Sequence, residues 1–295
     1  MPESPYVGRF APSPSGDLHF GSVVTAIAGF LQAKQHDGRW HLRIDDLDPP
    51  RTVPGAADTI RHTLERLGLQ WDGEVVYQST RRAAYRDARN ALEKRSLLYR
   101  CTCSRRTLGP GPYPGTCARH PIPPGPPAAW RVRVAGTEVH IEDPLQGPQQ
   151  WALAELCGDF VVWRVEDLAA YHLAAVVDDA ALGVTQILRG ADLLDSAPRQ
   201  IYLQRLLGLP TPSYVHLPIA TSPAGQKLSK QSRAPAVSNQ NSGAVVCAAL
   251  RWLGQTVPPE ADAAPAALIL EEAARTWSLA AVPHQLALPA PAGWG

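Results

Sequence analysis

Two segments that lie far apart in the chain contain residue types that bind polyphosphates. Residues 9–22 form a turn rich in proline, serine and glycine, and the apolar run 23–31 that follows is typical of a helix packed against a sheet. A helix N-terminus presents unpaired N–H groups and the positive end of its dipole, so this turn suits a phosphate. Residues 225–231 hold two lysines three positions apart, flanked by glycine and serine, which also suits a polyphosphate. Taken alone, the first segment is more often a plain strand–helix loop, and the second is more often an ordinary solvated surface loop.

Charged residues also follow two predicted strands. Residues 40–44 alternate like a strand, and the acidic run that begins at Asp45 comes directly after them. Ligands of open α/β sheets gather at the carboxyl ends of strands, so Asp45 is well placed for one. The hydrophobic strand 183–188 leads into Arg189, whose guanidinium suits a carboxylate or a phosphate. The alternatives are a surface salt-bridge cluster around Asp45 and a structural ion pair for Arg189.

A cluster of cysteines indicates a metal site. Cys101 and Cys103 lie two residues apart and Cys117 follows after a loop rich in glycine and proline, a spacing that can surround one tetrahedral Zn²⁺. The chain has 5 cysteines in all, too few and too uneven for a disulfide framework. The fourth ligand is Tyr113, His120 or water. Because the loop has few apolar residues to hold it together, we expect the zinc to be structural.

Composition limits the classes of function. The chain has 295 residues, enough for one large domain or two small ones. Its 28 basic and 27 acidic side chains almost cancel, so any surface for nucleic acid must be a local patch. No apolar run reaches the roughly 18 residues of a membrane span, and the N-terminus lacks the layout of a signal peptide. We therefore expect a cytoplasmic protein with no membrane partner.

Periodicity gives the elements that must position these residues. Helical spacing of apolar residues occurs in 52–67, 81–95, 192–207, 244–253 and 264–277. Strand-like alternation or short apolar runs occur in 75–77, 130–141, 159–164 and 215–220. The helix 81–95 is strongly basic, and a solvated face is the usual explanation for such charge.

Together these pieces resemble the class I aminoacyl-tRNA synthetases, and specifically their glutamyl branch. Residues 19–22 (HFGS) are similar to the HIGH motif of that class, and 227–231 (KLSKQ) to its KMSKS loop. Segments 9–14, 43–48 and 189–192 are similar, in order and approximate spacing, to sequence blocks of the glutamyl-tRNA synthetases. Any one motif is weak, whereas the ordered set is specific.

The resemblance implies an α/β fold with a Rossmann-type nucleotide-binding catalytic domain. That domain would be formed by two halves, residues 1–98 and 159–232, the second ending in the KMSKS-like loop. Residues 99–158 would form a small zinc-bearing α/β insertion that is similar to an acceptor-binding domain. Residues 233–295 would form a short helical C-terminal region, too small for a full anticodon-binding domain.

Because the helical region is short, the chain looks like the truncated paralogues of this family that attach glutamate to the queuosine base at the wobble position of tRNA(Asp). The implied partners are L-glutamate, ATP with Mg²⁺, and tRNA(Asp) bearing queuosine, and we expect a monomer. The alternatives are a truncated glutamyl-tRNA synthetase that acylates a tRNA 3′ end, a small-molecule nucleotidyltransferase of the same superfamily, and a tRNA-binding protein without activity.

The resemblance also implies roles for individual residues. Those implied for glutamate are Arg9, Ser13, Asp45, Tyr171 and Arg189. The two arginines would hold the two carboxylates of glutamate, because a guanidinium makes paired hydrogen bonds to a carboxylate. Asp45 would take the α-ammonium, although the family usually has the longer Glu at this position.

For ATP, the implied residues are Pro12, His19, Gly21, Ser22 and Lys230. The implied catalytic residues are His19, Lys227 and Lys230, with the lysines neutralising charge on the α-phosphate. Ser22 stands where the family's second histidine would be. The implied zinc ligands are Cys101, Cys103, Tyr113 and Cys117, which favours Tyr113 over His120.

Overall fold

The computed structural model of the chain describes residues 5–134, 136–228, 235–237 and 240–294. Its helices are α1 (Phe20–Gln35), α2 (Ala56–Arg66), α3 (Arg82–Lys94), α4 (Arg105–Leu108), α5 (Thr116–Arg119), α6 (Leu153–Leu156), α7 (Tyr171–Ala181), α8 (Ala197–Leu207), α9 (Ser242–Trp252) and α10 (Ala266–Thr276). Its strands are β1 (Val7–Phe10), β2 (Arg39–Ile44), β3 (Val76–Tyr77), β4 (Leu98–Cys101), β5 (Ala129–Val132), β6 (Glu138–Asp143), β7 (Gly147–Ala152), β8 (Phe160–Trp163), β9 (Gln186–Gly190), β10 (Ser213–Leu217), β11 (Ile219–Thr221) and β12 (Ala287–Pro289).

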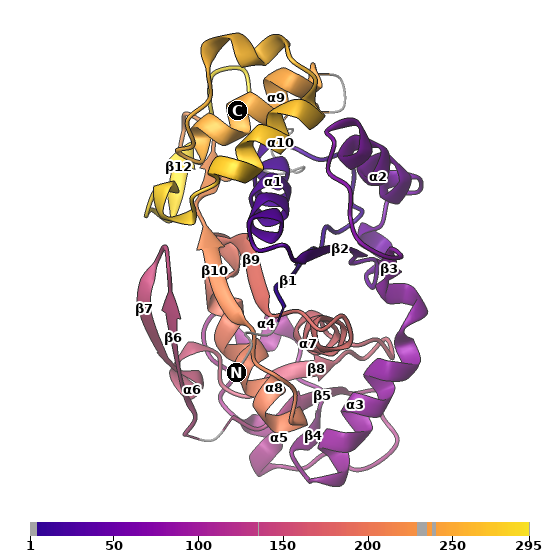
Figure 1. Cartoon of the computed structure of the whole chain (residues 1–295). Helices are drawn as coiled ribbons and strands as arrows, with labels where there is room; N and C mark the ends of the chain where they lie inside the picture. Colours follow the sequence, from indigo (N-terminus) through magenta and orange to yellow (C-terminus); the bar gives the residue numbers. More distant parts are fainter. Residues whose placement is uncertain (1–4, 135, 229–234, 238–239, 295) are drawn as a thin grey trace.

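Parallel strands form the middle of the molecule (Figure 1). One group has the order β1-β2-β3, and β9 pairs with β10. The two groups meet at β1, where the backbone N–H of Thr185 donates to the carbonyl of Val7 at 2.9 Å. Chain order therefore reverses between β1 and β9, and ligands of open α/β sheets bind at such a switch point.

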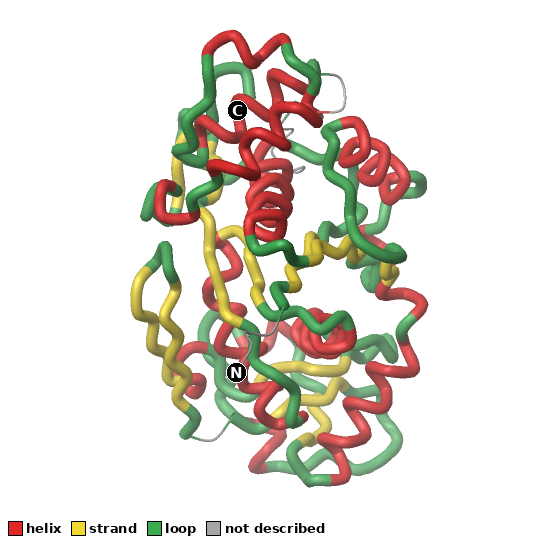
Figure 2. The backbone as a smooth tube through the Cα atoms, viewed as in Figure 1, coloured by secondary structure: helices red, strands yellow, loops and turns green. Residues whose placement is uncertain are grey.

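Helix α1 lies over this layer and beneath the C-terminal helices α9 and α10 (Figures 1 and 2). It is apolar all round and nearly every residue from Phe20 to Ala33 is buried, as expected for a helix covered on both sides. The polar Gln32 inside this core accepts a hydrogen bond from the Trp277 indole at 2.7 Å. Because α1 is buried along most of its length, its N-terminus has a fixed position relative to the strand ends.

A second α/β unit follows β3. Strands β4, β5 and β8 pair antiparallel as one sheet, and β6 and β7 form a hairpin that packs against β10 and α8. Helices α3, α7 and α8 cover a second core that includes Tyr85, Leu92, Val162 and Ile201. Because β8 belongs to this sheet, the sheet includes residues on both sides of the expected boundary at 158.

The structure differs from the sequence-based expectations at three elements. Helix α2 begins at Ala56, later than position 52, because Pro54 and the left-handed Gly55 (φ 77°) precede it. Residues 191–196 form a 3-10 turn ahead of α8, which has Pro198 in its first turn. The C-terminal region also contains a strand, since β12 pairs parallel with β11. Among the described residues, no helix combines the length and apolarity needed to span a bilayer.

Candidate active site

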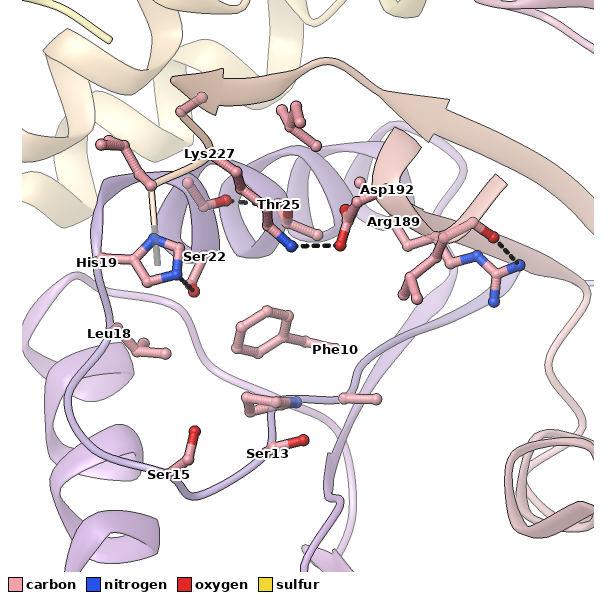
Figure 3. A pocket seen from close by; sticks show the side chains of 18 of the residues that line it. Phe10, Ser13, Ser15, Leu18, His19, Ser22, Thr25, Arg189, Asp192 and Lys227 are labelled. Atoms are coloured by element: carbon pink, nitrogen blue, oxygen red, sulfur yellow. Dashed lines mark hydrogen bonds and ion pairs between the residues drawn. The ribbon is translucent and has the colours of Figure 1, made fainter. Parts of the chain in front are cut away.

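A cavity of about 780 Å³ opens where the carboxyl ends of the central strands meet the start of α1 (Figure 3). Its walls come from the segment after β1, the first turns of α1, the ends of β9 and β10, and the segment after β11. Nine residues implied by the motifs line it, namely Arg9, Pro12, Ser13, His19, Gly21, Ser22, Tyr171, Arg189 and Lys227. The fold therefore brings the two distant motif segments into one cavity.

The N-terminus of α1 forms one wall. His19 precedes the first helical residue, and its carbonyl accepts the N–H groups of Ser22 and Val23 at 3.0 and 3.1 Å. The Ser22 hydroxyl lies 3.2 Å from His19 Nε2, so it contacts the imidazole of the same motif. Gly21 lies beside this ring and lines the cavity, and a Cβ there would meet the His19 ring at 3.4 Å and the Ala220 side chain at 3.5 Å. These are the features of a phosphate-binding helix N-terminus.

Arg9, on β1, is held by an acidic partner. Its Nε donates to Asp179 Oδ1 at 3.0 Å, and the same oxygen accepts from Arg43 Nη1 at 2.7 Å. Burial would raise the pKa of Asp179, but the two guanidinium groups outweigh it and hold that pKa below its usual value. Asp179 is therefore an ionised carboxylate shared by two buried arginines.

Arg189, at the end of β9, has a different environment. It is 4% exposed, and its Nε, Nη1 and Nη2 donate to His216 Nε2 at 3.1 Å, Gln200 Oε1 at 2.7 Å and the Leu193 carbonyl at 3.1 Å. All three acceptors are neutral, and within the part of the chain that the structure describes Arg189 forms no ion pair. Burial lowers the pKa of Arg189, which reflects the cost of keeping this charge out of water.

Asp45 does not line the cavity. Both of its oxygens accept from Arg43, at 2.6 and 3.2 Å, and its side chain is 8% exposed. Burial is the largest influence on Asp45 and raises its pKa, against the opposing effect of Arg43. Its shorter side chain ends at this ion pair, so binding of an ammonium group by Asp45 stays a prediction.

The lysine loop contributes Lys227 to the cavity. Its ammonium group forms an ion pair with Asp192, which follows β9, and Figure 3 shows the two groups facing each other across the rim. Lys230, the second lysine of the motif, lies outside the described residues. Tyr171 begins α7 at another wall of the cavity and is 38% exposed.

The three clustered cysteines lie together at the end of β4 and on α5. The sulfur atoms of Cys101, Cys103 and Cys117 all lie within 4.8 Å of one another. The Tyr113 hydroxyl lies 3.5 Å from Cys101 Sγ and 3.9 Å from Cys103 Sγ, whereas His120 is exposed. Three thiols and a phenol around one point form a donor set that fits Zn²⁺.

Several buried polar residues at the site were not singled out from the sequence. They are Asp143, Asp179, Gln200 and His216, all less than 4% exposed. The signal for Asp179 was present, since two adjacent acids interrupt an otherwise apolar run in α7. Burial of a carboxylate requires a partner, so such a pair points to buried cations elsewhere in the chain.

Known proteins resemble this chain over nearly its whole length. The family model "tRNA synthetases class I (E and Q), catalytic domain" matches residues 6–109 and 124–247. A glutamyl-Q tRNA(Asp) synthetase from Aromatoleum aromaticum is 52% identical, covering 97% of this chain and 93% of that protein. One from Dechloromonas aromatica is 48% identical, with 98% and 99% covered. The fold matches a glutamate-tRNA synthetase from Elizabethkingia anophelis with a TM-score of 0.83 at 22% identity, over 98% of this chain and 68% of that one.

Proposed function

The chain belongs to the class I tRNA synthetases for glutamate and glutamine, and from that premise we propose that it is a ligase that transfers L-glutamate to the queuosine base of tRNA(Asp). Relatives about half identical over nearly the whole chain carry the name glutamyl-Q tRNA(Asp) synthetase. The geometric observation that supports the proposal is the single cavity in which a phosphate-binding turn meets Arg9 and Arg189.

The amino acid is the carboxylate-bearing reactant. Arg189 offers a buried positive charge without a described acidic partner, and a substrate carboxylate supplies the missing negative charge. Arg9 lies beside it on the neighbouring strand, and Ser13 and Tyr171 add hydroxyl groups to the same cavity. Asp45 is proposed for the α-ammonium, which requires one of its oxygens to be shared with Arg43.

ATP occupies the side of the cavity formed by Pro12, His19, Gly21 and Ser22, with its phosphates toward the N-terminus of α1. An oxygen of the glutamate carboxylate attacks the α-phosphorus, the bond to pyrophosphate breaks, and glutamyl-adenylate forms. Lys227, with Lys230 from the loop outside the described residues, neutralises the charge that develops on the phosphate. Mg²⁺ accompanies ATP as in other class I synthetases. Transfer of glutamate to the tRNA base then releases AMP.

We assign a structural zinc to Cys101, Cys103, Tyr113 and Cys117. The small core around them contains few other apolar side chains, so the metal would hold this loop against β4. Cys117→Ser is expected to abolish stoichiometric zinc in elemental analysis and to lower the unfolding temperature, whereas Cys247→Ser, away from the cluster, leaves the zinc content unchanged. Equal zinc content in both variants contradicts the assignment.

The domain organisation is also a proposal. We propose residues 1–98 and 159–232 as the two halves of the catalytic domain, 99–158 as the zinc-bearing insertion and 233–295 as the C-terminal region. The protein is proposed to act in the cytoplasm as a monomer.

The experiment that tests the proposal has two stages. ATP–pyrophosphate exchange measures adenylate formation, and we expect it to depend on L-glutamate and to be far weaker with L-glutamine or L-aspartate. Transfer of labelled glutamate to tRNA(Asp) with and without queuosine, followed by nucleoside mass spectrometry, then locates the product. Label on modified queuosine supports the proposal. Label on the 3′-terminal adenosine indicates a glutamyl-tRNA synthetase instead, and absence of exchange indicates a different nucleotidyltransferase.

A further inference from the structure

Behind Arg189 lies a chain of buried hydrogen bonds that leads away from the cavity. Arg189 Nε donates to His216 Nε2 at 3.1 Å, and His216 Nδ1 lies 2.7 Å from Asp143 Oδ2. The exposed fractions of the three residues are 4% for Arg189, 0% for His216 and 3% for Asp143. The chain therefore connects β9 through β10 to the β6–β7 hairpin, in which Asp143 is the last residue of β6.

The carboxylate at the end of this chain is itself held in place. Asp143 Oδ1 accepts the backbone N–H groups of Leu145 at 2.9 Å and Gln146 at 3.0 Å. Asp143 Oδ2 accepts the backbone N–H of His216 at 3.0 Å in addition to its imidazole. Each of these four contacts, the ones found among the described residues, is with a donor, so the protein alone can orient the carboxylate.

The hydrogen-bond partners determine the tautomer of His216. A guanidinium nitrogen can only donate, so His216 Nε2 must carry a lone pair and the ring proton must lie on Nδ1. A carboxylate is the acceptor that holds the proton there. Burial and the charge of Arg189 lower the pKa of His216 in spite of Asp143, so the imidazole stays neutral and keeps its acceptor.

The arrangement leaves part of Arg189 available for a ligand. A guanidinium has five N–H donors, and the described contacts use one on each of its three nitrogens. Within the described residues, one N–H on each terminal nitrogen has no protein acceptor, and such a pair suits the two oxygens of a carboxylate. The guanidinium is planar, so its orientation sets the directions of these two N–H groups. The hydrogen bond from Nε to His216 fixes that orientation and so determines how well the two N–H groups meet a carboxylate.

We propose that Asp143 and His216 form a positioning pair that fixes the guanidinium of Arg189, so that the hairpin β6–β7 takes part in glutamate recognition without touching the substrate. The proposal rests on the proposed function for its substrate. The strand β10 alone would leave the imidazole free to take either tautomer. The hairpin supplies the carboxylate that selects one.

Asp143→Asn tests the pair with almost no change in volume. The two backbone N–H groups of Leu145 and Gln146 keep the Asn oxygen on their side, so the amide nitrogen faces His216. There it donates to Nδ1, which moves the ring proton to Nε2 and opposes it to the N–H of Arg189, and it no longer accepts the His216 backbone N–H. We expect the KM for glutamate in ATP–pyrophosphate exchange to rise about 10- to 100-fold, with the KM for ATP within about twofold of the wild-type value. His216→Leu should behave similarly, and His216→Gln should recover part of the loss because its amide oxygen can accept from Arg189.

The matched control is Gln146→Ala in the same hairpin. The Gln146 side chain donates to the carbonyls of His216 at 2.9 Å and Gln285 at 3.1 Å, so its loss loosens the hairpin but leaves the pair intact. We expect the KM for glutamate to stay near the wild-type value. An equal rise in Gln146→Ala and Asp143→Asn overturns the proposal, because hairpin docking alone would then explain the effect.

The tautomer can also be read without substrate. Nitrogen-15 NMR of the wild-type protein, with the His216 signal assigned by its loss in His216→Gln, should show a protonated Nδ1 and an unprotonated Nε2. The opposite tautomer, or a rapidly exchanging ring, overturns the proposal. Lack of glutamate-dependent exchange in the wild-type protein contradicts the proposed function instead, since the NMR result does not depend on it.

Discussion

Arg9 and Arg189 lie on neighbouring strands at one cavity, yet their charges are balanced in different ways. Arg9 donates to Asp179, a carboxylate that it shares with Arg43. Arg189 is equally buried and donates to an imidazole, an amide oxygen and a backbone carbonyl. A buried charge costs free energy unless an opposite charge neutralises it. Asp179 neutralises Arg9 within the protein, whereas we expect a carboxylate of the substrate to neutralise Arg189.

The comparison makes the two arginines different kinds of residue. The pair Arg9–Asp179 is complete in the absence of ligand, and its loss should first affect folding. The neutral acceptors around Arg189 orient its guanidinium without neutralising the charge. Loss of the Arg189 side chain should therefore affect glutamate binding first. Variants at the two sites should therefore separate stability from activity.

The largest effect is expected from Asp179→Asn. This change keeps the shape of the side chain but removes the charge that serves Arg9 and Arg43, and it should lower the free energy of unfolding by about 3–5 kcal/mol in urea titrations. Asp58→Asn is the control, because Asp58 and Arg61 form an exposed pair on α2, and a change below about 0.5 kcal/mol is expected there. Similar losses in the two variants would contradict the view that Asp179 is the structural partner.

Arg189→Gln should have the next largest effect, and on activity rather than on folding. Loss of a buried guanidinium that meets a substrate carboxylate should reduce kcat/KM for glutamate by about 10²- to 10³-fold. The free energy of unfolding should change little, since an unneutralised buried charge is removed with its hydrogen bonds. Arg189→Lys keeps the charge but not the paired donors, and its activity should lie between those of the wild-type protein and Arg189→Gln. Full activity in Arg189→Gln would remove this residue from glutamate binding.

The smallest expected effect is the pH dependence of stability that arises from His216, the imidazole that accepts from Arg189. Among the described residues, the groups that face His216 are Asp143, Arg189, the Leu193 carbonyl and the stacked ring of Tyr214. Burial is the largest influence on His216 and lowers its pKa in the folded protein. Below about pH 6.5, His216 therefore binds a proton in the unfolded chain but not in the folded protein. Stability from this group is present above about pH 6.5 and is lost as pH falls below it, by at most about 1.4 kcal/mol per pH unit.

Unfolding titrations at about pH 7.5 and about pH 5.5 measure this dependence. His216→Gln should reduce the difference between the two conditions, whereas Gln146→Ala should retain it because the titrating group remains. An unchanged pH dependence of stability in His216→Gln would contradict a lowered pKa of His216 in the folded protein.

The elements around the cavity were largely predictable from the sequence. The strand before the turn, helix α1, the strand ending in Arg189 and the lysine loop each have a local pattern, and their order carries the family resemblance. The partners of the buried charges were not predictable in this way. Arg9 and Asp179 lie 170 positions apart, and only the folded chain brings them together.

Asp45 is a residue whose position was predictable from the sequence but whose environment was not. Its position at the end of β2 was expected, and so was the alternative of an ion pair. The structure shows that ion pair with Arg43, two residues away, with the two side chains 8% and 1% exposed. Local spacing located both residues of the pair, whereas only the folded chain shows how little of the pair is exposed.

The most direct test of the comparison is a crystal structure of the protein with L-glutamate bound. We expect one carboxylate of glutamate within hydrogen-bond distance of both terminal nitrogens of Arg189, with the contacts Arg9–Asp179 and Arg189–His216 unchanged. A glutamate whose carboxylates both lie away from Arg189, or one that displaces Asp179 from Arg9, would contradict this expectation.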